Sequence, residues 1–114
     1  KQKTIDTVQK AIEQMNLSDK INESVKRLSG GQQRRVAIAR TIAQKPRLIL
    51  ADEFLSELDD NTANNVWNTM LDYVKTESIT LVIVEHNVSR AKSAQRCFSM
   101  QNQDTLEYAT LKEV

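Results

Sequence analysis

The sequence predicts an α/β fold in which helices at the N-terminal end precede a strand–helix–strand unit. Two short apolar runs support this prediction, at residues 48–52 and 80–84. Both runs are too short for a helix of typical length, so each is consistent with a buried strand. An amphipathic helical stripe separates them, as expected when a helix crosses over between parallel strands in a right-handed βαβ unit. We therefore expect both strands to be parallel and buried.

Two helices are expected before the first strand. Apolar residues at helical spacing predict one near the N-terminus, with Thr4 as its N-cap. Residues 16–27 are expected to form a loop or a short helix. A second helix is predicted from Gly31 to Gln44, because Pro46 prevents it from continuing. The apolar face of the first helix consists of Ile5, Val8, Ile12 and Met15.

The helix between the two strands is expected to begin at Asp59 or Asp60, either of which can cap it. After the second strand we expect a short helix around residues 88–95 and a strand from Cys97 to Met100. The polar residues 101–104 are expected to form a turn that leads to residues 106–109. The long helix has a continuous apolar stripe that places Trp67 in the core rather than in a base-stacking site, and the stripe consists of Ala63, Val66, Trp67, Met70, Leu71 and Val74.

The composition limits the core and the cellular setting. The 114 residues suffice for one small domain, and a hydrophobic fraction of 39% with 4% aromatic residues predicts a modest core. Cys97 is the only cysteine, so the chain can form neither an internal disulfide nor a thiol zinc cluster, and a reducing, cytosolic setting fits. We interpret Cys97 as a buried small hydrophobe. No apolar run approaches the roughly 20 residues that span a bilayer, so membrane association is expected through a partner.

The only two glycines, Gly30 and Gly31, open the second predicted helix and indicate an anion site. A helix N-terminus offers unpaired N–H groups and the positive end of the helix dipole, and glycines let a phosphate approach the backbone closely. Ser29 can add a hydroxyl donor.

The net charge of +1 argues against a nucleic-acid-coating surface. We therefore interpret the basic stretch 24–51 as local to the phosphate site; it contains no acidic residue and has Lys26, Arg27, Arg34, Arg35, Arg40, Lys45 and Arg47.

The glycine turn reads Leu28-Ser29-Gly30-Gly31-Gln32 and is followed by Gln33-Arg34-Arg35-Val36-Ala37-Ile38-Ala39-Arg40. Together these residues resemble the LSGGQ signature motif of ATP-binding-cassette (ABC) ATPases. Three further motifs follow in the order that this family has. The run 48–51 with Asp52-Glu53 resembles the Walker B strand, residues 56–59 resemble the D-loop, and His86 resembles the switch histidine. The resemblance covers about residues 24–90, and four motifs in order are far more specific than one alone.

The resemblance implies a partial P-loop NTPase-type parallel sheet, preceded by part of a helical subdomain. Residues 1–45 would belong to the helical subdomain with the signature helix, and residues 46–114 to the C-terminal part of the ATPase core. A Walker A loop needs G-x-x-x-x-G-K-[ST], and this chain contains none because its two glycines are consecutive. We therefore expect these residues to be the second half of a nucleotide-binding domain and to be inactive alone.

The catalytic chemistry is expected at the carboxyl ends of the two strands, where a parallel sheet leaves a crevice for ligands. Asp52 would hold Mg²⁺, directly or through water, because a hard cation that bridges phosphates prefers carboxylate oxygen. The resemblance implies that Glu53 polarises the attacking water. His86 would lie beside the same crevice and donate a hydrogen bond to a γ-phosphate oxygen of ATP.

The family's mechanism implies two partners. Two nucleotide-binding domains would form a head-to-tail dimer around ATP, and a transmembrane permease would hold the protein at the cytoplasmic face of the cell membrane. ATP-driven closing of the dimer would then power transport, and no nucleic acid is expected as a partner. The cofactors are ATP and Mg²⁺, and the residues expected to bind nucleotide are Ser29, Gly30, Gly31, Gln32 and Asp59, of which the signature residues act on the partner's ATP.

Two other functions remain open. One is a soluble ATPase of the same superfamily that acts in DNA repair, chromosome organisation or translation. A long heptad region before the signature marks the repair type, and residues 1–27 contain none. The other is a non-catalytic interaction or regulatory fragment that never hydrolyses ATP alone.

The chain departs from the family pattern in two places, the pair Phe54-Leu55 and Glu85. Phe54-Leu55 follow Asp52-Glu53 where the family usually has residues such as Pro-Thr, which can shift the approach of the D-loop. Glu85 precedes His86 where a small hydroxyl residue is common. Neighbouring side chains on a strand face opposite ways, so contact between Glu85 and His86 is not assumed. Neither change removes a group that performs chemistry, so we expect a competent half-site.

Overall fold

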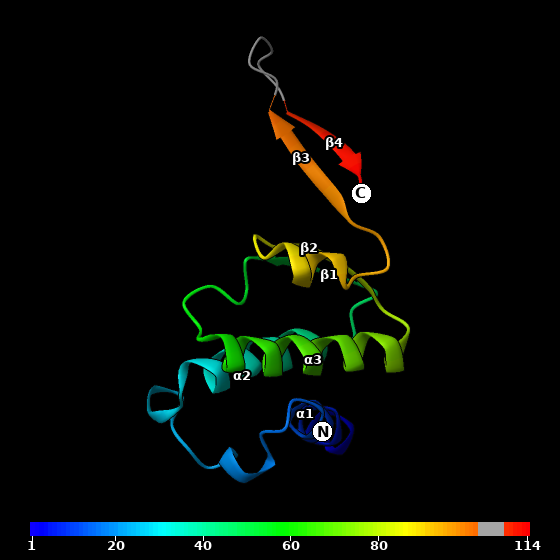
Figure 1. Ribbon diagram of the computed structural model, residues 1–114. Coiled ribbons are helices and arrows are strands. Elements are labelled where there is room, and N and C mark those ends of the chain that lie inside the picture. The colour runs from blue at the N-terminus through cyan, green and yellow to red at the C-terminus, as the bar shows by residue number, and fades with distance from the viewer. Residues whose placement is uncertain (103–108) are drawn as a thin grey trace. The chain divides into compact units, whose positions relative to one another are not determined.

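The computed structural model describes residues 1–102 and 109–114. It confirms the predicted α/β class, with helices and two small sheets (Figure 1). By packing, the chain divides into two compact units, residues 1–83 and residues 84–114. The predicted division into residues 1–45 and 46–114 refers to the family's subdomains and stays a prediction.

The first unit begins with helix α1 (Gln2–Gln14). The predicted cap at Thr4 is wrong, because the helix already includes Gln2 and Lys3, both good helix formers, and Lys1 is the N-cap residue. The predicted apolar face is buried only at its C-terminal end. Met15, at the C-cap, is fully buried, whereas Ile5 is 43% and Val8 45% exposed.

Two short 3₁₀ turns, η1 (Ser18–Lys20) and η2 (Val25–Arg27), confirm the predicted loop or short helix between the first two helices. Helix α2 (Gly30–Ile42) is two residues shorter at its C-terminal end than predicted. Lys45 adopts a left-handed conformation with φ of 53° before Pro46, and this turn leads the chain from α2 into the first strand.

Strands β1 (Leu48–Asp52) and β2 (Thr80–Val84) form a parallel pair connected through helix α3 (Asp60–Glu77), as the βαβ prediction requires (Figure 1). Ile49 and Ala51 on β1 are buried. The expectation that both strands are buried is wrong for one face of the pair. Side chains alternate along a strand, and the opposite face exposes Leu48, Leu50 and Val82, with Leu50 74% exposed.

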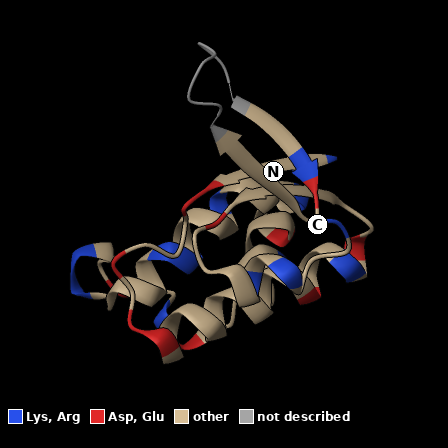
Figure 2. Cartoon of the chain, turned by 45° about the horizontal axis from the view of Figure 1, so that its top comes forward, with Lys and Arg blue, Asp and Glu red and all other residues tan. Residues whose placement is uncertain are grey.

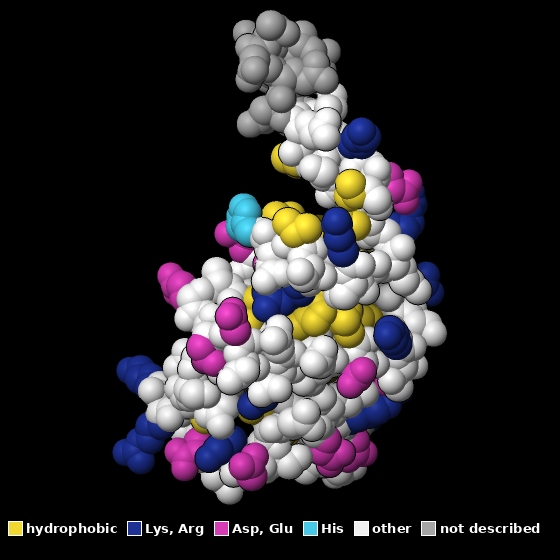
Figure 3. Space-filling view, in the orientation of Figure 1, with side chains coloured by type: hydrophobic (Ala, Val, Ile, Leu, Met, Phe, Trp, Pro, Cys, Tyr) yellow, Lys and Arg dark blue, Asp and Glu magenta, His cyan; other side chains and the backbone are white. Residues whose placement is uncertain are grey.

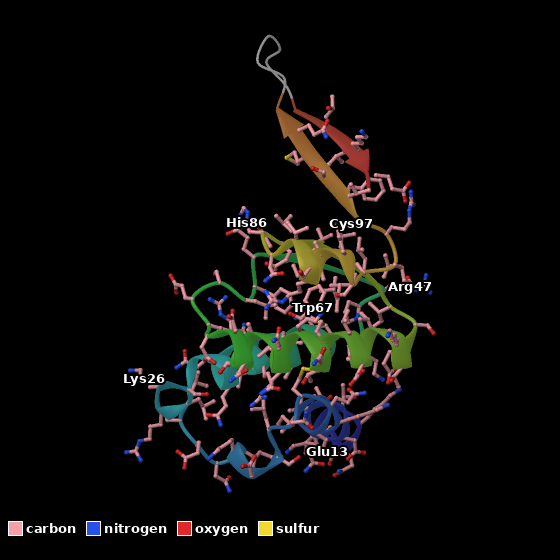
Figure 4. All side chains as sticks on the ribbon, viewed as in Figure 1. Glu13, Lys26, Arg47, Trp67, His86 and Cys97 are labelled. Carbon is pink, nitrogen blue, oxygen red and sulfur yellow. The ribbon has the colours of Figure 1, made fainter. Side chains whose placement is uncertain are left out.

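Helix α3 provides much of the core of the first unit. Asp59 is its N-cap, which confirms one of the two predicted caps, and Ser78 ends it in a left-handed conformation. Trp67 is 5% exposed and lies between α3 and the β1–β2 pair, so its assignment to the core is confirmed (Figure 4). The other buried residues of α3 are Ala63, Val66, Met70, Tyr73 and Val74.

The second unit has a short helix α4 (Val88–Lys92) and a hairpin of strands β3 (Phe98–Asn102) and β4 (Ala109–Glu113). The two strands are antiparallel, with Met100 opposite Leu111. Residues 101 and 102 belong to β3, so the turn predicted to begin at residue 101 is wrong there. The rest of that prediction lies outside the described residues, except that residue 109 begins β4. Cys97 is only partly buried.

No helix among residues 1–102 and 109–114 is long and apolar enough to cross a bilayer.

Candidate functional site

The signature turn, Ser29–Gln32, is held by a capping box at the start of α2. The Ser29 Oγ accepts a hydrogen bond from the Gln32 backbone N–H at 3.2 Å, and the Gln32 Oε1 accepts one from the Ser29 backbone N–H at 3.0 Å. Because Ser29 is an acceptor in this bond, its hydroxyl proton is still available for a ligand. The same holds for the two N–H groups of the Gln32 side-chain amide.

The backbone of the signature turn also suits an anion. Intrahelical bonding leaves the Gly30 and Gly31 N–H groups without an acceptor in the helix, and the first turn of α2 contains no acidic residue. Over the described chain as a whole, basic and acidic residues are interspersed rather than gathered on one face (Figure 2). The electrostatic preference for an anion is therefore local to this turn.

The two glycines have different surroundings. Gly31 is buried, and a Cβ placed there would overlap with the Cγ2 methyl of Thr62 on α3. Gly30 is exposed, and a Cβ there would be 3.2 Å from Leu58 Cδ2. Sequence reasoning missed this packing role of Gly31, because the partner residue lies on another helix. The expected role of both glycines in admitting a phosphate stays a prediction.

Asp52 and Glu53 lie at the carboxyl end of β1, and both are exposed. Glu53 has a φ of 48°, in the left-handed region that non-glycine residues rarely adopt, and its carbonyl accepts a hydrogen bond from the Ser56 N–H at 3.1 Å. The chain therefore turns sharply at Glu53, directly after the end of β1.

The carboxylates of Asp52 and Glu53 fit a magnesium ion that is bound together with phosphates. Residues 1–102 and 109–114 contain no cluster of three acidic, histidine or cysteine side chains that could hold a metal by themselves. Mg²⁺ commonly takes only one or two protein carboxylates and completes its shell with water and phosphate oxygens. Asp52 is suited to that kind of site.

The departure at Phe54-Leu55 has a structural role. Leu55 is buried, and the Phe54 ring stacks on Trp67 with ring centroids 6.2 Å apart. Both side chains fix the loop after Asp52-Glu53 to the core of the first unit. We call residues Glu53–Asp59 the 53–59 loop.

Asp59 ends the 53–59 loop and caps α3 by accepting a hydrogen bond from the Thr62 backbone N–H at 3.1 Å. Hydrogen bonds from the Thr62 side chain and backbone lower the pKa of the Asp59 carboxyl from its usual value. The carboxylate is exposed and keeps acceptor capacity for another group.

Arg34 joins the signature helix to the 53–59 loop. Its Nη2 donates a hydrogen bond to the Ser56 carbonyl oxygen at 3.1 Å. From the sequence, Arg34 follows the signature motif within a basic stretch, and its bond to the 53–59 loop was missed because its partner lies 22 positions further along the chain. The structure thus brings the signature turn and the 53–59 loop together within the first unit.

His86 belongs to the second unit, in the turn between β2 and α4. Its side chain is exposed and points outward from this turn (Figure 3, Figure 4). The predicted meeting of His86 with Asp52 and Glu53 therefore stays a prediction.

Glu85 organises the turn that contains His86. Its Oε1 accepts hydrogen bonds from the backbone N–H groups of His86 and Asn87, each at 3.0 Å, and lies 3.6 Å from Arg90 Nη1. The Asn87 side chain caps α4 by accepting from the Arg90 N–H at 2.9 Å. The extra carboxylate beside the histidine thus bonds to the backbone of the turn.

Comparison with known proteins identifies relatives. The family model described as "ABC transporter" matches residues 1–56. The lipoprotein-releasing system ATP-binding protein LolD of Nitrobacter hamburgensis is 36% identical over 91% of this chain and 45% of its own length. The methionine import ATP-binding protein MetN of Clostridioides difficile is 36% identical over 90% of this chain and 32% of its own. The chain thus spans less than half the length of these relatives.

Solved structures show the same architecture. A transporter described as a metal-chelate type ABC transporter, in an inward-facing conformation, superposes on 95% of this chain and 42% of its own with a TM-score of 0.82 and 27% identity. An ATP-binding cassette of an ABC transporter in its ADP conformation superposes on 84% of this chain and 38% of its own, with a TM-score of 0.77 and 26% identity.

Proposed function

Since this chain belongs to the ABC transporter ATP-binding family, we propose that it is part of a subunit that hydrolyses ATP to power transport across a membrane. The observation that supports this most directly is the attachment of the signature turn to the 53–59 loop, through Arg34 and through Gly31 packed against Thr62. The signature motif and the loop that contains the D-loop motif are thus in direct contact within this chain.

In this proposal Asp52, Glu53 and His86 act on the ATP of their own domain. Asp52 would hold Mg²⁺ through a carboxylate oxygen, and the ion would supply positive charge to offset that of the phosphates. Glu53 orients the attacking water and accepts its proton. His86 donates a hydrogen bond to a γ-phosphate oxygen.

The signature turn serves the nucleotide of a second domain. In a head-to-tail dimer, the Gly30 and Gly31 N–H groups and the Ser29 hydroxyl donate hydrogen bonds to the γ-phosphate held by the partner. Gln32 supports this arrangement through the capping box, and Asp59 lies at the end of the loop that approaches the partner. Each subunit therefore contributes residues to two sites.

The membrane partner in this proposal is a transmembrane permease, and the subunit is peripheral at the cytoplasmic face. The similar relatives are described as parts of lipoprotein-releasing and methionine import systems. Since these two substrates are unrelated, we assign no substrate to this chain. No nucleic acid takes part in the proposed function.

The experiment that tests the proposed function is Glu53→Gln in the natural full-length protein. This change removes the proton acceptor while it keeps the size and polarity of the side chain, so ATP binding should persist and turnover should nearly stop. An ATP-bound dimer should then accumulate and be detectable by size-exclusion chromatography. Glu13→Gln is the matched control, because Glu13 is an exposed carboxylate on α1, outside the four motifs, and its loss should leave turnover intact. Near-normal hydrolysis by Glu53→Gln would reject the assignment.

A further inference from the structure

We propose that Arg34 is a positioning residue that fixes the 53–59 loop to the signature helix α2 and thereby holds Glu53 in place for hydrolysis. The inference rests on the proposed function for the role of Glu53. It goes beyond that function because it assigns a specific part in turnover to a side chain that was expected only to add positive charge near the phosphate site.

The conformation of the 53–59 loop depends on contacts with other elements of the fold. Phe54 and Leu55 anchor its first part in the core, but Ser56 and Glu57 are exposed. Glu53 and Glu57, on either side of Ser56, have φ angles of 48° and 67°. Residues with a Cβ atom are disfavoured in this left-handed region, so local preferences do not select this conformation. A contact with another element is required to maintain it.

Arg34 provides such a contact at the centre of the loop. The Ser56 carbonyl accepts from Arg34 Nη2 at 3.1 Å, and the Ser56 N–H donates to the Glu53 carbonyl at 3.1 Å. Both peptide groups beside Ser56 are therefore held, one by the arginine and one within the loop. A guanidinium is always charged, and its hydrogen bonds to a carbonyl are stronger than those of a neutral donor.

The attachment joins two parts of the chain that serve different nucleotides in the proposed dimer. Arg34 lies one helical turn after Gly30 and Gly31 on α2. The same end of α2 approaches Leu58 of the loop and Thr62 of α3. A displacement of the signature turn is therefore transmitted through Arg34 to the loop that contains Glu53.

The test compares Arg34→Met with Arg34→Lys in the natural full-length protein. Methionine keeps an unbranched chain of similar length but cannot donate, whereas lysine keeps a charged donor that can reach the same carbonyl. We expect Arg34→Met to lower kcat about tenfold, as the loss of a charge-assisted hydrogen bond would, with little change in KM for ATP. Arg34→Lys should recover most of the loss. Lys75→Met, at an exposed cation on α3, should behave like the wild type.

Amide hydrogen exchange gives a second readout that does not depend on ATP chemistry. In Arg34→Met the N–H groups of Ser56 and Leu58 should exchange faster than in the wild type, while those in the middle of α3 should not change. Unchanged exchange at Ser56 and Leu58 would overturn the proposal. Faster exchange with unchanged kcat, or a lysine variant as impaired as the methionine variant, would overturn it equally. Failure of the proposed function itself would be seen separately, as normal turnover by Glu53→Gln.

Discussion

Replacing Gly31 with alanine tests whether the signature helix needs a glycine to approach α3. A Cβ at this position would overlap with Thr62 Cγ2 and lie 3.9 Å from Val66 Cγ2. Overpacking of a close helix contact costs about 1–3 kcal/mol, and alanine in a helix regains at most about 1 kcal/mol relative to glycine. We therefore expect the free energy of unfolding to fall by about 1–2 kcal/mol. Urea denaturation followed by Trp67 fluorescence measures this change.

Gly30→Ala is the matched control for this prediction. Its new Cβ would be 3.2 Å from Leu58 Cδ2, the end of a flexible side chain that can move aside, so stability should hardly change. Thr62→Ser provides a rescue, because it removes the overlapping methyl and keeps the hydroxyl that bonds to Asp59. The double variant Gly31→Ala/Thr62→Ser should recover most of the loss. Equal stability of Gly31→Ala and Gly30→Ala, or no rescue by serine, would refute the packing role.

Two further predictions concern acid stability and ATP binding. The pKa of the Asp59 carboxyl is lowered from 3.8 by hydrogen bonds from Thr62, so its stabilising effect is present above pH 3.8 and is lost as the pH falls through the lower folded-state value. Asp59→Asn should therefore reduce the difference between urea midpoints at neutral and acidic pH, and an unchanged difference would reject this role. Calorimetric titration of this 114-residue chain with Mg-ATP should show neither tight binding nor hydrolysis, because the chain contains no Walker A cradle. Micromolar binding at one site would contradict that expectation.

The elements that were predicted correctly depend on residues close together in the sequence. Asp59 caps α3 because the residues that it bonds to lie within one helical turn. The apolar stripe that contains Trp67 has helical period, so burial of one face follows from the spacing alone. The same reasoning found the β1–α3–β2 unit, since short β-branched and apolar runs flank the stripe.

The features that were missed depend on contacts distant in sequence. The cap at Thr4 was wrong because a capping residue type does not by itself stop a helix from beginning earlier. The expected burial of Leu50 failed because a strand pattern does not say what covers each face. The packing of Gly31 on Thr62 and the bond from Arg34 to Ser56 required the three-dimensional approach of α2 to α3, which no periodicity in this sequence encodes.

The most direct test of the central claim, that one chain serves two nucleotides, is ATPase activity in mixed dimers of the full-length protein. Ser29→Arg places a bulky cation in the signature turn, and Asp52→Asn weakens Mg²⁺ binding at the other motif. With both changes on one subunit, both composite sites are damaged and activity should be lost. With one change on each subunit, both lesions fall in the same site, so the other site should retain single-site turnover. Equal residual activity and equal ATP occupancy in the two arrangements would contradict the assignment of Ser29 to the partner's nucleotide.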